Sequence, residues 1–261
     1  MLQQAFAAHT AIIAEDDLSI EGLAVAGSWL TQELDEFSDL DLVLITNEKV
    51  GGDKEKMMAY ANKFGNLLNA FTGEHVGEPR LLICLYSNPL LHVDIKFITA
   101  DELKTRVENP VLLFDRTGHL QQIIDSTSYQ FPQPDHQWIE DRFWTWVHYA
   151  LLKIGRGEYM EAHDFLAFLR MVVFGPLLHI KNNNLPKGVR KVETTIAAED
   201  FNQLQQTLAV NNKASLLAAL QNAVQLYRSL RKELFTTNTT LQHQTEEAVM
   251  KYFEEMKKGI H

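Results

Sequence analysis

Residues 22–45 read GLAVAGSWLTQELDEFSDLDLVLI. A short apolar segment ends at Gly27-Ser28, ten residues intervene, and Asp39-Leu40-Asp41 begins a second apolar segment. Both apolar segments have the length and composition of β-strands. Because side chains two residues apart on a strand point to the same face, Asp39 and Asp41 are expected to project together, while Leu40 and Leu42 enter the core.

The pair of aspartates is electrostatically costly, and a divalent cation would remove that cost. Hard carboxylate oxygens suit Mg²⁺ best, so Asp39 and Asp41 are predicted to be metal ligands. A turn at Gly27 lets backbone amides approach a phosphate, and Ser28 adds a hydroxyl donor, which makes both residues candidates for nucleotide binding. Taken alone, Ser38-Asp39-Leu40-Asp41 is more typical of a solvated strand edge, at the transition from a turn to a strand.

A later segment supplies a third carboxylate. His92, Asp94 and Lys96 alternate with apolar residues, so the three polar side chains share one face of a predicted strand. If this strand lies beside the Asp39–Asp41 strand, Asp94 joins the pair as a catalytic residue and metal ligand. His92 and Lys96 then become candidate substrate contacts. Three carboxylates around one or two Mg²⁺ ions suit in-line displacement at a phosphate. The alternative is the exposed face of an amphipathic strand.

The chain is expected to form two domains, residues 1–130 and 131–261, because two prolines interrupt it at Pro132 and Pro134. The first part has 20 acidic and 9 basic residues, and the second has 14 and 15. Strand and helix patterns alternate before the prolines, whereas only helical patterns follow them. The predicted fold class is therefore α+β: a mixed sheet with flanking helices, then a helical bundle.

The hydrophobic patterns predict the individual elements. Strands are expected at 22–26, 40–45, 81–86, 91–98 and 111–114. Helices are expected at 3–14, 53–68, 100–107, 136–154, 158–182, 199–208, 212–234 and 240–258, and residues 187–197 have no assignment. We expect the aromatic side chains of the helical part to form its core, among them Trp144, Trp146, Phe165 and Phe168.

Composition excludes several classes of function. The chain has 261 residues and a formal net charge of −10, which argues against binding to a nucleic-acid backbone. The single cysteine, Cys84, lies in an apolar segment and is expected to be buried. The first residues lack the basic region of a signal peptide, and no apolar stretch is judged long enough to span a bilayer. These features predict a cytoplasmic protein without a membrane partner.

The spacing of the carboxylates resembles the nucleotidyltransferase superfamily. Its pattern is an apolar strand, Gly-Ser, nine to thirteen residues, Asp-apolar-Asp, and a carboxylate on a later strand. The match covers residues 22–45 and 90–98 directly. One departure is Trp29, because many members have a small residue after Gly-Ser. The departure concerns the predicted contact with the triphosphate and not the predicted metal site.

The second half is similar to antibiotic adenylyltransferases, in particular those that modify aminoglycosides and lincosamides. The similarity lies in residues 143–159, an aromatic helix followed by Lys153 and an Arg156-Gly157-Glu158 turn, and in Asp115-Arg116-Thr117-Gly118-His119-Leu120. The resemblance makes Lys153 a candidate for nucleotide binding and Glu158 a candidate for substrate binding. Each also has a simpler explanation, because the helix dipole favours a lysine at a helix end and a glutamate at a helix start.

The resemblance implies a Mg²⁺-dependent enzyme that moves a nucleoside monophosphate from ATP or another NTP to a small-molecule hydroxyl. The acceptor would be an aminoglycoside or lincosamide antibiotic, bound between the domains, and the enzyme would use two metal ions. The family also suggests a homodimer, although the aromatic helices could equally form the core of a monomer. The alternatives are a catalytically weak nucleotide-binding or antitoxin-like module and a nucleotidyltransferase that modifies proteins.

Overall fold

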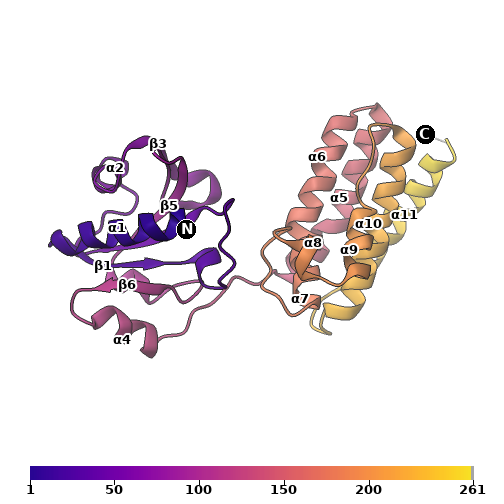
Figure 1. Ribbon diagram of the computed structural model, residues 1–261. Coiled ribbons are helices and arrows are strands. Elements are labelled where there is room, and N and C mark those ends of the chain that lie inside the picture. Colours follow the sequence, from indigo (N-terminus) through magenta and orange to yellow (C-terminus); the bar gives the residue numbers. More distant parts are fainter. Residues whose placement is uncertain (260–261) are drawn as a thin grey trace. The chain divides into compact units, whose positions relative to one another are not determined.

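The computed structural model describes residues 1–259 and has the predicted α+β architecture (Figure 1). The chain separates into two compact units, residues 1–131 and 132–261. We call them the sheet unit and the helical unit.

The sheet unit contains a six-stranded mixed sheet in the order β3-β4-β5-β2-β1-β6 within the described residues. Strands β2 and β5 run parallel, and the other neighbouring pairs run antiparallel. The strands are β1 (Ile20–Val25), β2 (Leu40–Thr46), β3 (Leu67–Gly73), β4 (Glu78–Tyr86), β5 (Leu91–Ile98) and β6 (Val111–Asp115).

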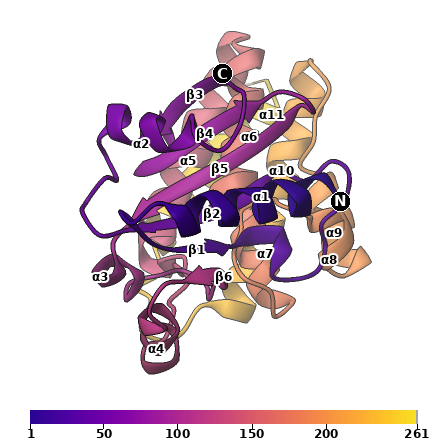
Figure 2. The same ribbon diagram turned by 60° about the vertical axis from the view of Figure 1, so that its left-hand side comes forward.

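Two pairs of helices pack on the sheet. Helices α1 (Leu2–Asp16) and α2 (Lys54–Ala61) contribute to the large core on one face. Helices α3 (Ala100–Leu103) and α4 (His119–Ser126) cover a smaller cluster on the other face, around Ala24, Ile45 and Ile98. Figure 1 shows α1 and α4 on opposite sides of β1 and β6. Figure 2 shows α1 lying across the sheet. Helices α3 and α4 cover only part of this second face of the sheet.

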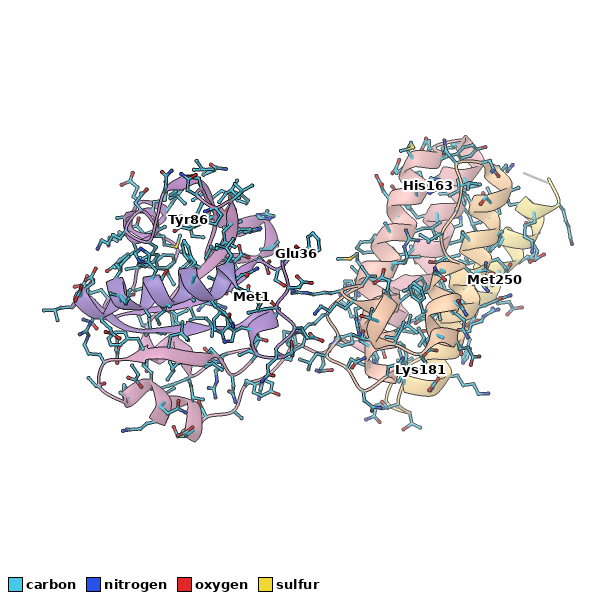
Figure 3. All side chains as sticks on the ribbon, viewed as in Figure 1. Met1, Glu36, Tyr86, His163, Lys181 and Met250 are labelled. Carbon is cyan, nitrogen blue, oxygen red and sulfur yellow. The ribbon has the colours of Figure 1, made fainter. Side chains whose placement is uncertain are left out.

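The predicted helix 53–68 is wrong in its second half. Helix α2 ends at Ala61, and residues 67–73 form the strand β3, which pairs with β4. Tyr86, labelled in Figure 3, donates a hydrogen bond of 2.8 Å to the Ala61 carbonyl. Gly65 packs directly against the Tyr86 ring, where the chain turns away from the helix. Pairing with β4 therefore outweighs the helical spacing of the apolar residues.

Two further differences occur near the end of the sheet unit. The predicted helix 100–107 ends at Leu103, and α4 was not predicted. The guanidinium of Arg106 donates to the carbonyl oxygens of Leu103, Ile124 and Thr127, at 3.4, 2.9 and 2.6 Å. One long side chain thus satisfies backbone groups at the ends of both short helices, which local periodicity cannot reveal.

The helical unit contains four long helical stretches and two short helices in the described chain, in agreement with the predicted bundle (Figure 1). Helix α6 continues through the π-helical turn η3 into α7. The short helix α8 lies in the segment left without an assignment. The elements are α5 (His136–Arg156), α6 (Tyr159–Leu169), η3 (Arg170–Phe174), α7 (Gly175–Lys181), α8 (Val192–Thr195), α9 (Ala198–Gln205), α10 (Lys213–Leu234) and α11 (His243–Lys257).

A fully buried carboxylate, Glu140 of α5, lies inside this bundle. It accepts hydrogen bonds from the Trp144 indole at 3.3 Å, from the Arg231 guanidinium at 3.1 Å and from the Gln242 backbone N–H at 2.9 Å. The Tyr227 hydroxyl donates a further hydrogen bond. Buried charge is costly unless it is paired and hydrogen-bonded, and here both conditions are met. Glu140 thereby connects α5, α10 and the start of α11.

The continuous helical run Tyr159–Lys181 is long and apolar enough to cross a membrane, contrary to the expectation from the sequence. Half of its most apolar window is buried in the fold. Leu166, Leu169, Val173 and Leu177 of this run belong to the core of the helical unit. The apolar composition of the run is thus accounted for by packing against neighbouring helices.

Candidate active site

The parallel pairing of β2 with β5 brings two of the predicted carboxylates side by side. Asp41 is the register partner of Asp94. Asp39 directly precedes β2, and Asp94 lies within reach of its charge. The apolar residues between the polar ones on β5, Val93, Ile95 and Phe97, are fully buried on the opposite face. The strands of Asp41 and Asp94 are therefore neighbours in the fold, as the sequence spacing could only assume.

Gly27 approaches the Asp41 carboxylate so closely that no other residue fits. Its φ angle is +60°, and a Cβ atom at this position would lie 1.9 Å from Asp41 Oδ2. The Ala26 backbone N–H also donates to the Asp41 carbonyl oxygen, at 3.0 Å. Both the backbone conformation and the close approach require glycine. The Gly27–Trp29 turn is consequently held against the start of β2.

The residues after Gly27 occupy a short 3-10 helix, Gly27–Trp29, which includes Ser28. Trp29 is partly buried and packs against the large core of the sheet unit. The bulky residue that departs from the superfamily pattern thus has a packing role. Because the indole packs against the core, the departure does not by itself argue against an anion near the Gly27-Ser28 backbone.

The Asp94 carboxyl is electrostatically perturbed by its surroundings. Burial raises its pKa above the ordinary value, the neighbouring His92 opposes that rise, and Asp39 adds to it. His92 Nε2 lies 2.9 Å from Asp94 Oδ1, and the His92 side chain is half exposed. A cation placed among these carboxylates would relieve both the desolvation and the repulsion.

The carboxylates share a face but are not gathered around a common point. In the part of the chain that the structure describes, no group of three His, Cys, Asp or Glu side chains is placed closely enough to hold a metal ion. The chemistry of the donor set nevertheless fits Mg²⁺, because Asp39, Asp41 and Asp94 all offer carboxylate oxygens. The metal assignment therefore rests on their shared location and charge.

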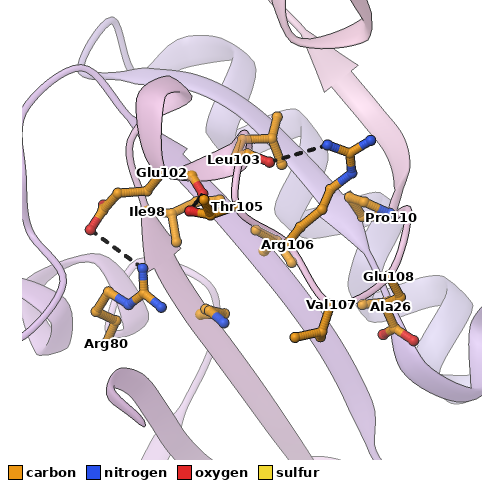
Figure 4. Close-up of a pocket in the computed structure, with 12 residues that line it drawn as sticks. Ala26, Arg80, Ile98, Glu102, Leu103, Thr105, Arg106, Val107, Glu108 and Pro110 are labelled. Carbon is orange, nitrogen blue, oxygen red and sulfur yellow. Dashed lines mark hydrogen bonds and ion pairs between the residues drawn. The ribbon is translucent and has the colours of Figure 1, made fainter. Parts of the chain in front are cut away.

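A pocket of about 80 Å³ lies on the same unit and is drawn in Figure 4. Ala26, next to the Gly27 turn, contributes to its lining, as does Lys96 of β5. The Lys96 ammonium lies 2.8 Å from Glu78 Oε2, and Glu78 also binds Arg80 at 2.7 Å. Lys96 is thus placed at the pocket and is held there by an acidic partner.

Sequence spacing missed two residues that shape this site. Glu108 lies on the loop before β6 and accepts a 2.9 Å hydrogen bond from the Gly27 backbone N–H. Gln3 of α1 is buried and donates to the carbonyl oxygens of Asp35 and Ser38, at 2.9 and 2.7 Å. It therefore fixes the loop that leads to Asp39. Neither residue belongs to a local motif, and no pattern in the sequence identifies them.

Lys153 and Glu158 belong to the helical unit. The Lys153 ammonium lies 2.8 Å from Glu158 Oε2 and 2.9 Å from Glu161 Oε2. These hydrogen bonds, the one to Glu158 first, raise the pKa of Lys153. The ammonium of Lys153 and the carboxylate of Glu158, which the sequence made candidates for nucleotide and substrate binding, therefore pair with each other. Glu161, which sequence reasoning did not single out, shares the lysine.

Comparison with known proteins gives matches over nearly the whole chain. The family model described as streptomycin adenylyltransferase matches residues 3–256. Among solved structures, the chain is similar to an aminoglycoside 6-adenyltransferase from Bacillus subtilis. The identity is 17%, the match covers 98% of each chain, and the TM-score is 0.41. No curated protein matches the chain.

Proposed function

The chain belongs to the streptomycin adenylyltransferase family, and we propose that it transfers AMP from ATP to a hydroxyl group of a streptomycin-type aminoglycoside. Family membership makes the chain a nucleotidyltransferase, as the resemblance found in the sequence implied. The donor, the acceptor and the residue roles are the proposed part. The observation that supports them best is the register pairing of Asp41 with Asp94, beside the Gly27 turn.

The proposed reaction is an in-line displacement at the α-phosphorus. The acceptor hydroxyl oxygen forms a bond to this phosphorus, the bond from the phosphorus to the bridging β-phosphate oxygen breaks, and pyrophosphate leaves. Asp39, Asp41 and Asp94 would hold Mg²⁺. The bound metal would neutralise the triphosphate and favour deprotonation of the attacking hydroxyl.

The chain's own groups have distinct proposed tasks. The backbone of Gly27 and Ser28 would bind the triphosphate, and a phosphate oxygen would take the place of the Glu108 carboxylate at the Gly27 N–H. Asp94 either completes the oxygen set or accepts the proton of the hydroxyl, and its Asp94→Ala variant is expected to lose turnover at every pH. His92 positions the Asp94 carboxylate through their 2.9 Å contact.

The proposed substrates also suit a particular compartment. We place the reaction in the cytoplasm, which is consistent with a nucleotide donor and a small cationic acceptor. The acidic sheet unit speaks against a nucleic-acid acceptor and suits a polycation. Cationic acceptors would be drawn to this unit by its net charge, and the attraction would weaken as salt is added.

The decisive experiment incubates the protein with Mg²⁺, streptomycin and each NTP in turn, and measures pyrophosphate release and product mass. We expect streptomycin to gain the mass of one nucleoside monophosphate, most rapidly with ATP. The Asp39→Asn variant should be inactive. The control Asp101→Asn, which changes an exposed aspartate of α3, should behave as wild type.

Three outcomes would contradict the proposal. Nucleotide binding without pyrophosphate release, over a panel of aminoglycosides and lincosamides, would indicate a binding module. Label transferred from ATP to protein would indicate a protein-modifying enzyme. Full activity of Asp39→Asn would remove the carboxylates from the mechanism.

A further inference from the structure

The backbone N–H of Gly27 has an acidic partner within the folded chain itself. It donates a 2.9 Å hydrogen bond to the Glu108 carboxylate, which lies 81 positions further along the sequence. Glu108 belongs to the segment between α3 and β6, residues 104–110, which forms neither helix nor strand. A backbone N–H has a single hydrogen, and a short bond to one acceptor uses it. An anion that binds at this N–H must therefore displace the Glu108 carboxylate.

The pairing of β1 with β6 explains why Glu108 reaches this turn. Val25 and Val111 are register partners at the end of the ladder. In an antiparallel pair, the residues before Val111 come to lie alongside the residues after Val25. Pro110 has no N–H with which to extend the ladder, so the chain leaves the sheet there. The Glu108 side chain then supplies the acceptor for Gly27 that the strand backbone no longer provides.

The segment that carries Glu108 is fixed on both sides of this residue. The Arg106 guanidinium donates to carbonyl oxygens at the ends of α3 and α4, and to the Asn109 side chain at 2.8 Å. Pro110 is buried at the start of β6. Val107, between these anchors, is 43% exposed. Glu108 can therefore change its side-chain rotamer while the anchors of the segment stay in place.

The 80 Å³ pocket gives a displaced Glu108 carboxylate a second position. Glu108 and Ala26 both contribute to its lining (Figure 4). The pocket is larger than the roughly 30 Å³ that a water molecule occupies in the liquid, so a carboxylate has room to turn into it. Besides Glu108, its lining includes one acidic residue, Glu102, and three cationic ones. The cationic residues, which favour a carboxylate at short range, are Arg80, Lys96 and Arg106.

We propose that Glu108 is an internal competitor of the nucleotide. Its carboxylate occupies the Gly27 N–H in the nucleotide-free enzyme and turns into the pocket when a phosphate oxygen binds there. Repulsion makes the two states exclusive, because a phosphate beside both Asp41 and Glu108 would meet two carboxylates at once. The contact lowers the apparent affinity for nucleotide, since only the open fraction of the molecules can bind it. This inference rests on the proposed function for the identity of the ligand.

The same competition acts on the product. Pyrophosphate keeps the two phosphates that leave the nucleotide, and it would be held by the same Gly27 backbone. Return of the Glu108 carboxylate to the Gly27 N–H would weaken this hold and favour release of pyrophosphate after transfer. Glu108 would thus lower the affinity for both the nucleotide and pyrophosphate.

The test measures the Kd of α,β-methylene-ATP with Mg²⁺ by calorimetry in wild type, Glu108→Gln and Glu108→Ala. This analogue cannot release pyrophosphate, so binding is observed without transfer. We expect the Kd to fall about tenfold in Glu108→Ala, which corresponds to an open fraction of about one in ten in wild type. The fall should be smaller in Glu108→Gln, because the amide oxygen still accepts from Gly27 but carries no charge. The Kd of pyrophosphate with Mg²⁺ should fall in the same order.

A matched control and a second readout separate competition from a structural role. Asp101→Asn removes one acidic charge from an exposed side chain of α3 and should bind the analogue as wild type does. A merely structural Glu108 would give lower thermal stability and unchanged or weaker binding in Glu108→Ala. Competition gives tighter binding by the folded molecules, whatever the melting temperature. In the nucleotide-free protein, the amide resonance of Gly27 should also shift in Glu108→Ala, and its absence of change would contradict the contact.

The outcomes distinguish this inference from the proposed function. Unchanged or weaker binding of the analogue by Glu108→Ala would overturn the inference, and the proposed function would stand if wild type still adenylylates streptomycin. Failure of wild type and both variants to bind the analogue would overturn the inference as well. Tighter binding in the variants without any transfer would support the competition and contradict the proposed function.

Discussion

The two units of this protein surround their key carboxylates in opposite ways. In the helical unit, Glu140 is fully buried and accepts hydrogen bonds from four different residues, one of them a guanidinium. In the sheet unit, Asp94 is partly exposed, is contacted by His92 and lies opposite Asp41. Burial raises its pKa, and Asp39 adds to the rise. Several hydrogen-bond donors thus surround the single carboxylate of Glu140, whereas several carboxylates lie near one another in the sheet unit.

This difference separates a structural acid from a candidate catalytic acid. A carboxylate that the fold itself satisfies contributes to stability and has no need of a ligand. Carboxylates that repel each other lower stability and gain from a cation that binds among them. Substitution of the buried Glu140 should therefore lower the free energy of unfolding and leave turnover unchanged. Substitution of a carboxylate in the candidate site should lower turnover without lowering the free energy of unfolding.

The largest effect is expected for Asp41→Asn. Loss of this charge should lower turnover on the order of a thousandfold, or about 4 kcal/mol of transition-state stabilisation. The melting temperature should stay the same or rise, because one of two carboxylates on aligned positions of neighbouring strands is neutralised. Pyrophosphate release and thermal unfolding check the two parts. A fall in melting temperature with turnover retained would assign Asp41 to structure.

The converse variant is Glu140→Gln. An amide cannot pair with Arg231 as the carboxylate does, so we expect a loss of about 3 kcal/mol in the free energy of unfolding. For a unit of this size the melting temperature should fall by about 10 °C. Turnover per folded molecule, measured well below the transition, should be unchanged. The exposed Glu247→Gln is the control, and equal stability of both variants would refute the structural role.

A smaller effect is expected for Gly27→Ala. The new methyl group would meet the Asp41 carboxylate and displace it, so turnover should fall roughly ten- to a hundredfold. Gly77→Ala is the matched control, since Gly77 has a φ of +77° and open space around it. It should cost about 1 kcal/mol of stability and leave turnover unchanged. Equal turnover in the two variants would show that the close approach to Asp41 has no consequence.

The smallest effect concerns Glu78. Its hydrogen bonds with Arg80 and Lys96 lower its pKa to about 2, although burial acts in the opposite direction. A lowered pKa in an acid stabilises the fold above the ordinary value of 4.5, and this stability is lost as pH falls towards 2. We expect about 1 kcal/mol, because the ion pairs are partly exposed. Urea unfolding at pH 7 and pH 3 should show a weaker pH dependence in Glu78→Gln. An unchanged dependence would contradict the assignment.

Periodicity was sufficient to predict the strands that carry the carboxylates. The alternation of polar and apolar residues over His92–Phe97 predicted which side chains of β5 are buried, and the structure confirms it. The long helices of the second half were predicted within a few residues, since their apolar faces repeat over many turns. Strong local patterns that agree with the packing are recovered from sequence alone.

The features that sequence could not predict depend on contacts between distant residues. Strand β3 forms because it pairs with β4, although its first residues continue the helical spacing of α2. Glu108 binds the Gly27 backbone across 81 positions of the chain, and Gln3 supports a loop more than 30 residues away. The contact between Trp146 and Phe168 also escaped prediction, because the two rings approach each other only when α5 and α6 pack together.

The register between β2 and β5 determines where residues can be inserted into this chain or deleted from it. Asp41 and Asp94 meet because their strands are aligned residue by residue, and deletion of one residue within β2 would turn the aspartate towards the core. Insertions in the turns at Ser87–Leu90 or Gly51–Gly52 would leave the alignment intact. Relatives and laboratory variants that keep activity should therefore vary in turn length and keep the length of these two strands constant.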